Sequence, residues 1–156
     1  MYIFKNKGIT IIEILIVIAI IGIISAIIFV NLSDFRNEQS LKNTSIDIVS
    51  VLNKARQKTL SSVNSMNYSV HFETGSATLF TGTIYNSLDS SNEVISFDPS
   101  VNIPVSGGLN IGGGSDVTFE RLTGDTIGGT IIISLVSDST QQKTVTINKT
   151  GVISSN

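Results

Sequence analysis

A single carboxylate lies inside the most apolar part of the chain. Glu13 follows two isoleucines, and the next seventeen residues, 14–30, carry no charge. A charged group costs roughly 2.5–3.5 kcal/mol at the centre of a bilayer and less near its surface, so acids in such segments are rare and commonly functional. The chemistry open to Glu13 is therefore to pair with a cation such as an amine. The alternative is that its carboxylate only reaches back to the lipid headgroups.

The residue types needed for catalysis or metal binding are almost absent. His71 is the only histidine and the chain has no cysteine, so no histidine-rich or thiolate metal site can be built, and we expect a structural role for His71. The glycines 112–114 lack the lysine of a phosphate-binding loop. A calcium site at Asp116, Asp125 and Asp138 is an alternative, although their spacing matches no calcium loop. We therefore expect no enzyme activity, no cofactor and no metal.

The apolar segment that holds Glu13 is long enough to cross a membrane. Residues 9–30 make 22 positions, or about 33 Å of helix, against a bilayer core of about 30 Å. Lys5 and Lys7 precede it, and the positive-inside rule then keeps the N-terminus in the cytoplasm. One alternative is a secretory signal peptide, but this block is longer than such an apolar region and lacks a small-x-small site at its end. The other is an unprocessed signal anchor.

Small residues lie on one face of this predicted helix. Ala19, Gly22 and Ala26 fall at i, i+3 and i+7, and small residues at such spacings let membrane helices approach closely. Chance placement is an equally good explanation, because Gly and Ala are common in membrane helices. We predict that this face packs against other helices.

The run Lys7-Gly8-Ile9-Thr10-Ile11-Ile12-Glu13, with Lys5 before it and the apolar block after it, resembles the signal of type IV prepilins. The resemblance implies cleavage after Gly8 and N-methylation of the new amine at Ile9 by a prepilin peptidase and methylase. It also implies that Glu13 attracts the Ile9 amine of a neighbouring subunit, a pair that is stronger in a dry filament core than in water. The implied partners are other pilin or pseudopilin subunits and an inner-membrane assembly platform.

The sequence differs from that family at two positions. Ile9 stands where the first mature residue is usually Phe, and the family tolerates other apolar residues there. Val30 stands near the place that a proline takes in many pilins. In assembled pili the helix often loosens between a glycine at the position of Gly22 and that proline. This chain has the glycine and lacks the proline, so its sequence does not decide whether the helix loosens there.

The helical pattern continues beyond residue 30, because no Pro or Gly occurs between Asn31 and Val63. Apolar and small residues recur at spacings of three and four along one stripe. They are Leu41, Ser45, Ile48, Leu52, Ala55 and Thr59. We predict one helix over residues 9–62, in which residues 9–30 lie in the membrane or filament core and residues 31–62 pack on a sheet.

Residues 63–156 are predicted to form an antiparallel β domain. Period-two, β-branched patterns occur at 68–72, 77–80, 93–97, 117–121, 129–136, 144–147 and 151–154. The first two and the last two of these flank short turns, as in hairpins. Pro99, Pro104 and the glycine-rich residues 106–115 predict a long loop. One long helix followed by a sheet is an α+β architecture. The resemblance to type IV prepilins implies that this fold is pilin-like and that residues 1–8 are a leader peptide.

Two later stretches resemble the H-type minor pseudopilins of type II secretion. One is the helix segment that ends in Ala55-Arg56. The other begins with Phe119 to Gly124, continues with the strand at 129–135 and ends with the hairpin that carries Gly151. The resemblance implies a β domain that faces outward or caps a filament tip.

These features together predict a structural subunit, a pilin or minor pseudopilin, held in the inner membrane with a cytoplasmic N-terminus and then assembled into an extracytoplasmic pilus or pseudopilus. A major pilin of an adhesion or motility pilus is the first alternative, and a DNA-uptake minor pilin is the second. Residues 63–156 hold eight acidic and three basic residues, which is not the basic patch that nucleic-acid binding needs. Nucleic acid is therefore not an expected partner.

Overall fold

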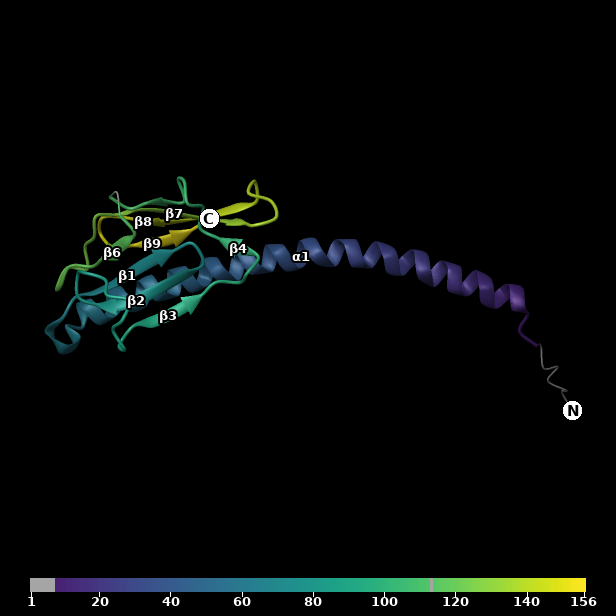
Figure 1. Ribbon diagram of the computed structural model, residues 1–156, viewed down its shortest axis with the longest axis horizontal. Coiled ribbons are helices and arrows are strands. Elements are labelled where there is room, and N and C mark those ends of the chain that lie inside the picture. The colour runs from purple at the N-terminus through teal and green to yellow at the C-terminus, as the bar shows by residue number, and fades with distance from the viewer. Residues whose placement is uncertain (1–7, 113) are drawn as a thin grey trace, which may run out of the picture. The chain divides into compact units, whose positions relative to one another are not determined.

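The computed structural model describes residues 8–112 and 114–156 and, within them, all side chains except those of residues 27–32. The chain divides between Arg36 and Asn37 into two compact units. Among the described residues, the first unit contains the start of the one α-helix, and the second contains the rest of that helix and the strands (Figure 1). Each unit is described by itself.

The helix α1 (Ile11–Leu60) is 50 residues long. Its only glycine is Gly22 and it holds no proline, so no residue removes a main-chain donor from the helix. The helix begins two residues later and ends two residues earlier than the sequence predicted. Thr10 caps its start, and Ser62 takes a left-handed conformation with φ of 47°, which an α-helix does not continue through.

The second unit forms a short 3-10 helix, η1 (Val63–Ser65), and two antiparallel sheets. The first sheet has the strand order β3-β2-β1-β6, and the second has the order β4-β7-β8-β9 with β5 also paired to β7. The strands are β1 (Tyr68–Glu73), β2 (Ser76–Thr81), β3 (Glu93–Ser96), β4 (Val101–Asn102), β5 (Leu109–Asn110), β6 (Asp116–Thr118), β7 (Gly129–Leu135), β8 (Gln142–Ile147) and β9 (Ile153–Ser155). The predicted α+β fold class is confirmed.

Both predicted hairpins are present, and the predicted long loop is partly strand. Glu73 pairs with Ser76 where β1 turns into β2, and the amide of Gly151 donates to the carbonyl of Asn148 between β8 and β9. Within residues 99–115, β4 and β5 each add two residues to β7. A strand of two residues is too short to show an alternating pattern, so the sequence predicted only a loop there.

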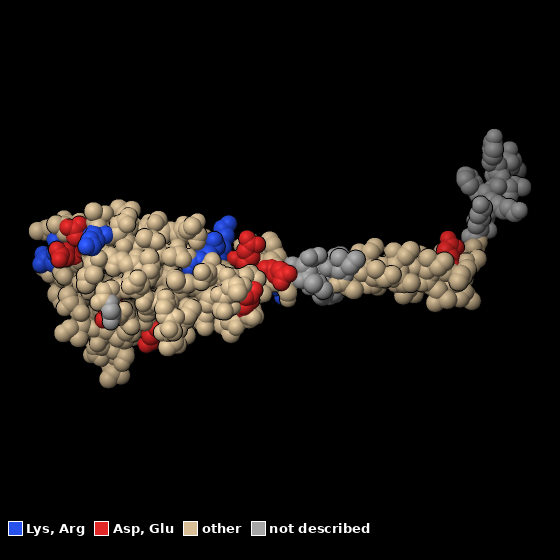
Figure 2. All heavy atoms as spheres, turned by 90° about the horizontal axis from the view of Figure 1, so that it is seen from above, with Lys and Arg blue, Asp and Glu red and all other residues tan. Residues whose placement is uncertain are grey.

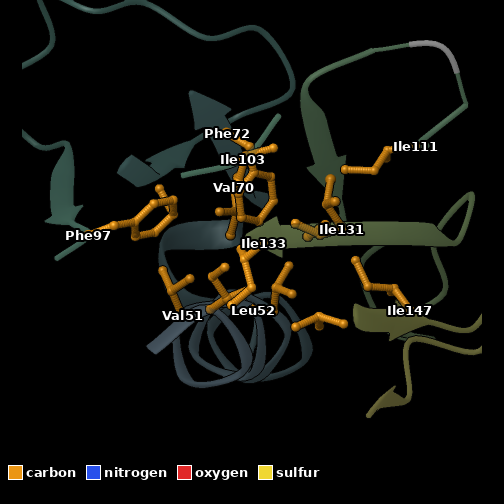
Figure 3. Close-up of a cluster of buried hydrophobic side chains, with 14 of the residues drawn as sticks. Val51, Leu52, Val70, Phe72, Phe97, Ile103, Ile111, Ile131, Ile133 and Ile147 are labelled. Atoms are coloured by element: carbon orange, nitrogen blue, oxygen red, sulfur yellow. The ribbon is translucent and has the colours of Figure 1, made fainter. Parts of the chain in front are cut away.

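One hydrophobic core joins the second half of α1 to both sheets. The predicted stripe on α1 is buried along its length, from Leu41 at 4% exposure to Thr59 at 0%. Leu52 of α1, Val70 of β1 and Ile133 of β7 belong to the same cluster (Figure 3). Burying an aliphatic side chain of this size stabilises a fold by roughly 1.5–3 kcal/mol, so the stripe accounts for much of the attachment of α1 to the sheets.

The side chain of Arg56 lies in a seam between two loops at the end of α1. Its Nη2 donates a hydrogen bond to the carbonyl of Thr150 at 3.2 Å. Gly124 and Gly151 cover it with φ of 71° and 73°. A Cβ placed on Gly151 would lie 2.6 Å from Arg56 Nε and 2.1 Å from the carbonyl oxygen of Gly124. Glycine is therefore required at position 151 both by conformation and by space.

Charged side chains are sparse on the β domain, and Figure 2 shows a broad area of it without any. Elsewhere, Lys54 and Lys58 of α1 both pair with Glu93 at the start of β3, with Lys58 Nζ at 2.9 Å from Oε1. Hydrogen bonds from Lys54 and then Lys58 hold the pKa of Glu93 below its ordinary value. These contacts tie the edge strand β3 to α1 at the surface.

Candidate functional site

The residues around the predicted cleavage position build the start of α1. Thr10 is the N-cap, because its Oγ1 accepts a hydrogen bond from the amide of Glu13 at 3.3 Å. Its carbonyl accepts from the amides of Glu13 at 3.1 Å and Ile14 at 3.3 Å. Thr-x-x-Glu is the sequence of a capping box. Glu13 is the acidic residue of the first turn, where negative charge offsets the positive end of the helix dipole.

Ile9 precedes this cap and is 73% exposed. Together with Glu13, Ile14, Val17 and Ile18 it lines a shallow hollow of about 270 Å³. An apolar residue just before the N-cap that packs on the fourth residue of the helix is a hydrophobic staple, and Ile9 and Ile14 hold these two positions. An apolar residue at position 9 thus has a structural reason within this chain.

The Gly8–Ile9 bond lies outside the helix and is exposed. Residues 8–10 have no regular secondary structure and are open to solvent. Apart from Gly8 and its two neighbours in the chain, no described residue has an atom within 4 Å of the place that a Cβ on Gly8 would take. Exposed, non-helical backbone is what a protease needs at a cleavage point. Lys5 and Lys7, the predicted basic flank, lie outside the described residues.

The predicted packing residues Ala19, Gly22 and Ala26 are exposed on α1. The larger apolar side chains around them are exposed as well, from 49% at Val17 to 64% at Ile23. Exposed apolar surface of this extent marks a contact with a membrane or another protein. Across the helical residues that the structure describes, no stretch is both long and apolar enough to span a membrane.

The other candidate residues do not assemble into a site. Asp116 Oδ1 lies 2.5 Å from His71 Nδ1, which gives the lone histidine a structural partner. Asp138 Oδ1 accepts hydrogen bonds from the amide and hydroxyl of Thr140, and Asp125 belongs to the loop that follows β6. Over residues 8–112 and 114–156, no group of three His, Cys, Asp or Glu side chains is arranged to hold a metal ion.

Thr10 is the site residue that sequence reasoning missed. The signal was present, because a threonine three positions before a glutamate at the start of an apolar run predicts a capping box. The position of Glu13 in an apolar segment indicated a role in the membrane or filament, and no helix cap was predicted there. Glu13 therefore has a role inside its own chain in addition to the one that the resemblance implies.

The prokaryotic N-terminal methylation motif matches residues 3–29 of the chain. No curated protein and no solved structure matches the chain. The motif covers the exposed Gly8–Ile9 bond, the cap at Thr10 and the apolar start of α1. It supports a type IV pilin-like structural protein, and it implies processing by a prepilin peptidase and assembly with other pilin subunits.

Proposed function

We propose that this chain is a structural subunit of a type IV pilus-like filament or type II secretion pseudopilus, cleaved after Gly8 and N-methylated at Ile9. One observation carries the proposal. An exposed glycine bond is followed at once by a capped apolar helix with Glu13 in its first turn. This arrangement lies inside the residues that the methylation motif matches.

Cleavage changes the charge at the start of this helix. A cut after Gly8 leaves a positive α-amine on Ile9, one residue before the cap, and methylation retains that charge. A cation is unfavourable at the positive end of a helix dipole. The negative charge of Glu13 offsets both the Ile9 amine and the positive helix end. The Ile9 amine of a neighbouring subunit has the same need for a carboxylate. Glu13 therefore serves its own helix end before assembly and the neighbour's amine within the filament, where a lower dielectric strengthens the pair.

The apolar start of α1 supplies the remaining contacts in this proposal. Residues 9–30 hold the chain in the inner membrane, with the N-terminus cytoplasmic because Lys5 and Lys7 precede them. An assembly platform then passes the subunit into the filament, whose core these residues form. The small face at Ala19, Gly22 and Ala26 allows close approach of neighbouring helices there.

Within this class we propose a minor, H-type pseudopilin. The three features of that resemblance are Ala55-Arg56, the stretch that ends in Gly124 and the hairpin that carries Gly151. They are far apart in sequence but meet at one place, where the side chain of Arg56 lies against both glycines. Quantitative mass spectrometry of sheared filaments separates a minor subunit from a major one. A chain that makes up the bulk of the sheared protein is a major pilin.

The cleavage is tested by mass spectrometry of the chain from membranes of its native host. We expect an N-terminus at methylated Ile9. Gly8→Val, which puts a branched side chain at the cut, should retain the leader and so show that the shortened form depends on this position. A wild-type chain that keeps Met1 in mature filaments or membranes would contradict the pilin proposal.

The charge of Glu13 is tested with two substitutions. Glu13→Gln keeps the size of the side chain and Glu13→Ala removes it, and both should still reach the membrane. We expect incorporation into filaments to fall by on the order of tenfold in each, because the neighbouring amine loses its partner. Glu38→Ala, which removes an exposed acid farther along α1, is the matched control. Normal incorporation of Glu13→Gln would show that assembly does not need this charge.

A further inference from the structure

The bond that is proposed to be cut lies directly before a helix start that one side chain defines. Thr10 is the N-cap of α1, and its Oγ1 accepts a hydrogen bond from the amide of Glu13 at 3.3 Å. The helix begins at Ile11, so only Ile9 stands between the cap and the carbonyl of Gly8. The position of the bond relative to α1 therefore depends on where this cap forms.

The backbone on the two sides of the cap differs in its access to a protease. Residues 8–10 are exposed and have no regular secondary structure. From Ile11 onward the backbone is α-helical, and two amides of the first turn donate to the carbonyl of Thr10. Peptide groups inside a helix are engaged in main-chain hydrogen bonds, whereas proteases cut exposed segments that are free of them. The cap thus keeps the bond on the accessible side of this boundary.

Ile9 links the bond to the helix through its side chain. It lines a hollow of about 270 Å³ with residues of the first two turns of α1, namely Glu13, Ile14, Val17 and Ile18. Ile9 and Ile14 hold the two positions of a hydrophobic staple, which fixes the angle at which a chain enters a helix. The nitrogen atom that the cut would release therefore belongs to a residue whose side chain shares a hollow with the start of α1.

We propose that Thr10 is a positioning residue for the cleavage, because its cap sets how the Gly8–Ile9 bond is presented to the peptidase. The inference rests on the proposed filament function, in which that bond is cut. Water adds across the amide in this reaction: the bond between the carbonyl carbon of Gly8 and the nitrogen of Ile9 breaks, Gly8 gains the hydroxyl group and the Ile9 nitrogen gains the proton. Thr10 acts on this reaction only through the position of the backbone.

Preorganisation of the substrate explains how the cap affects the rate. Holding a reacting bond in one geometry removes an ordering cost from binding and from the reaction. Without the cap, the start of α1 is spread over several positions, because isoleucine is only a moderate helix former. The bond is then in the productive geometry for a smaller fraction of the time. Loss of an N-cap changes the equilibrium at a helix end about fivefold, so we expect kcat/KM of the cleavage to change by a similar factor.

Four variants of the full chain test this role. Each is purified in detergent and added to solubilised membranes of the native host, and the shortened chain is followed by mass spectrometry. Thr10→Val keeps the shape of the side chain and removes the acceptor oxygen, so it should lower kcat/KM about fivefold. Thr10→Ser and Thr10→Asn retain an oxygen that can cap and should be cut at close to the parent rate. Thr83→Val, the same exchange at an exposed threonine of the β domain, is the control and should leave the rate unchanged.

The asparagine variant separates the cap from direct recognition of the threonine by the peptidase. A peptidase that binds the hydroxyl of Thr10 would cut Thr10→Asn as slowly as Thr10→Val, and this result would overturn the inference. Equal rates for Thr10→Val and the parent would overturn it as well. Across the variants, slower cleavage should accompany faster hydrogen exchange at the amide of Glu13. A parent chain that the host peptidase leaves uncut would instead overturn the proposed function, and the inference with it.

Discussion

At the scale of single residues, a hydroxyl and a carboxylate define where a helix of 50 residues begins. Isoleucine is only a moderate helix former, and the first turn of α1 is made mostly of it. The cap at Thr10 and the first-turn charge at Glu13 therefore decide where the helix starts. The same two residues follow the proposed cut, so they fix the conformation of the mature N-terminus.

Replacing Thr10 by Val tests the cap, because the shape is kept and the acceptor oxygen is lost. We expect the first turn to lose about 1 kcal/mol of stability, which corresponds to about fivefold faster hydrogen exchange at the amides of Glu13 and Ile14. Exchange is measured on the full chain in detergent micelles. Thr10→Ser keeps the oxygen and should exchange like the parent. Equal exchange in Thr10→Val would mean that the cap is not formed.

At Gly151, even the smallest substitution should strongly destabilise the β domain. Gly151→Ala adds one carbon at a place with φ of 73°, only 2.1 Å from the carbonyl oxygen of Gly124. We expect a loss of about 2–3 kcal/mol of unfolding free energy in urea denaturation. Gly75→Ala is the matched control, since a Cβ there would meet no atom within 4 Å beyond those of its two chain neighbours, and it should change stability by less than about 0.5 kcal/mol.

At the scale of elements, long periodic patterns were predictable and short or strained pieces were not. The stripe from Leu41 to Thr59 repeats often enough to predict both the helix and its buried face from the sequence alone. The strands β4 and β5 are made by pairing with β7, and two residues carry no period of their own. The left-handed backbone of Leu122, with φ of 71°, is imposed by the hydrogen bonds that close its loop, so its residue type gives no sign of it. At the candidate site, the motif predicted roles for Gly8, Ile9 and Glu13 that stay predictions, and the cap at Thr10 was overlooked.

The tie between α1 and β3 is electrostatic and should depend on pH. The pKa of Glu93 is lowered in the folded chain, chiefly by the hydrogen bond from Lys54 and then by that from Lys58. The ionised carboxylate thus stabilises the fold at pH values above its unfolded-state pKa. That contribution is lost as the pH falls through the lowered folded-state value.

Glu93→Gln measures the size of this contribution. Exposed ion pairs contribute about 0.2–1 kcal/mol. In urea denaturation at about pH 7, the free energy of unfolding of the parent should therefore be higher than that of the variant by about 0.5 kcal/mol. The two should become equally stable once the pH lies below the lowered folded-state pKa of Glu93. High salt should narrow the gap at neutral pH. Glu120→Gln is the control, since Glu120 forms no ion pair in the described parts of the chain. A gap that widens on acidification would contradict this account.

At the scale of the whole molecule, the two units differ in what holds them together. Residues 37–156 share one core that takes side chains from α1 and from both sheets. The side chains of the first unit that the structure describes are almost all exposed, so its stability in water rests on main-chain hydrogen bonds and the cap. This division fits the proposed filament subunit, because residues 37–156 bury a core of their own and the described apolar side chains before them stay exposed.

A shared core predicts that both sheets unfold together. In native-state hydrogen exchange of the full chain in detergent, the amides of Val70 in β1 and Ile131 in β7 should report the same opening free energy. Urea denaturation followed by fluorescence of the tyrosines and by far-UV circular dichroism should give coincident transitions. A sheet that opens at clearly lower free energy than the other would show two separate cooperative units.

The seam at Arg56 has a consequence for related chains. The long side chain at position 56 fills the space that side chains at 124 and 151 would otherwise occupy. A shorter residue at position 56 would not release the other two positions from glycine, because both have positive φ and a Cβ on Gly151 would still lie 2.1 Å from the carbonyl oxygen of Gly124. Related chains that keep this seam should therefore retain both glycines, whichever residue stands at position 56.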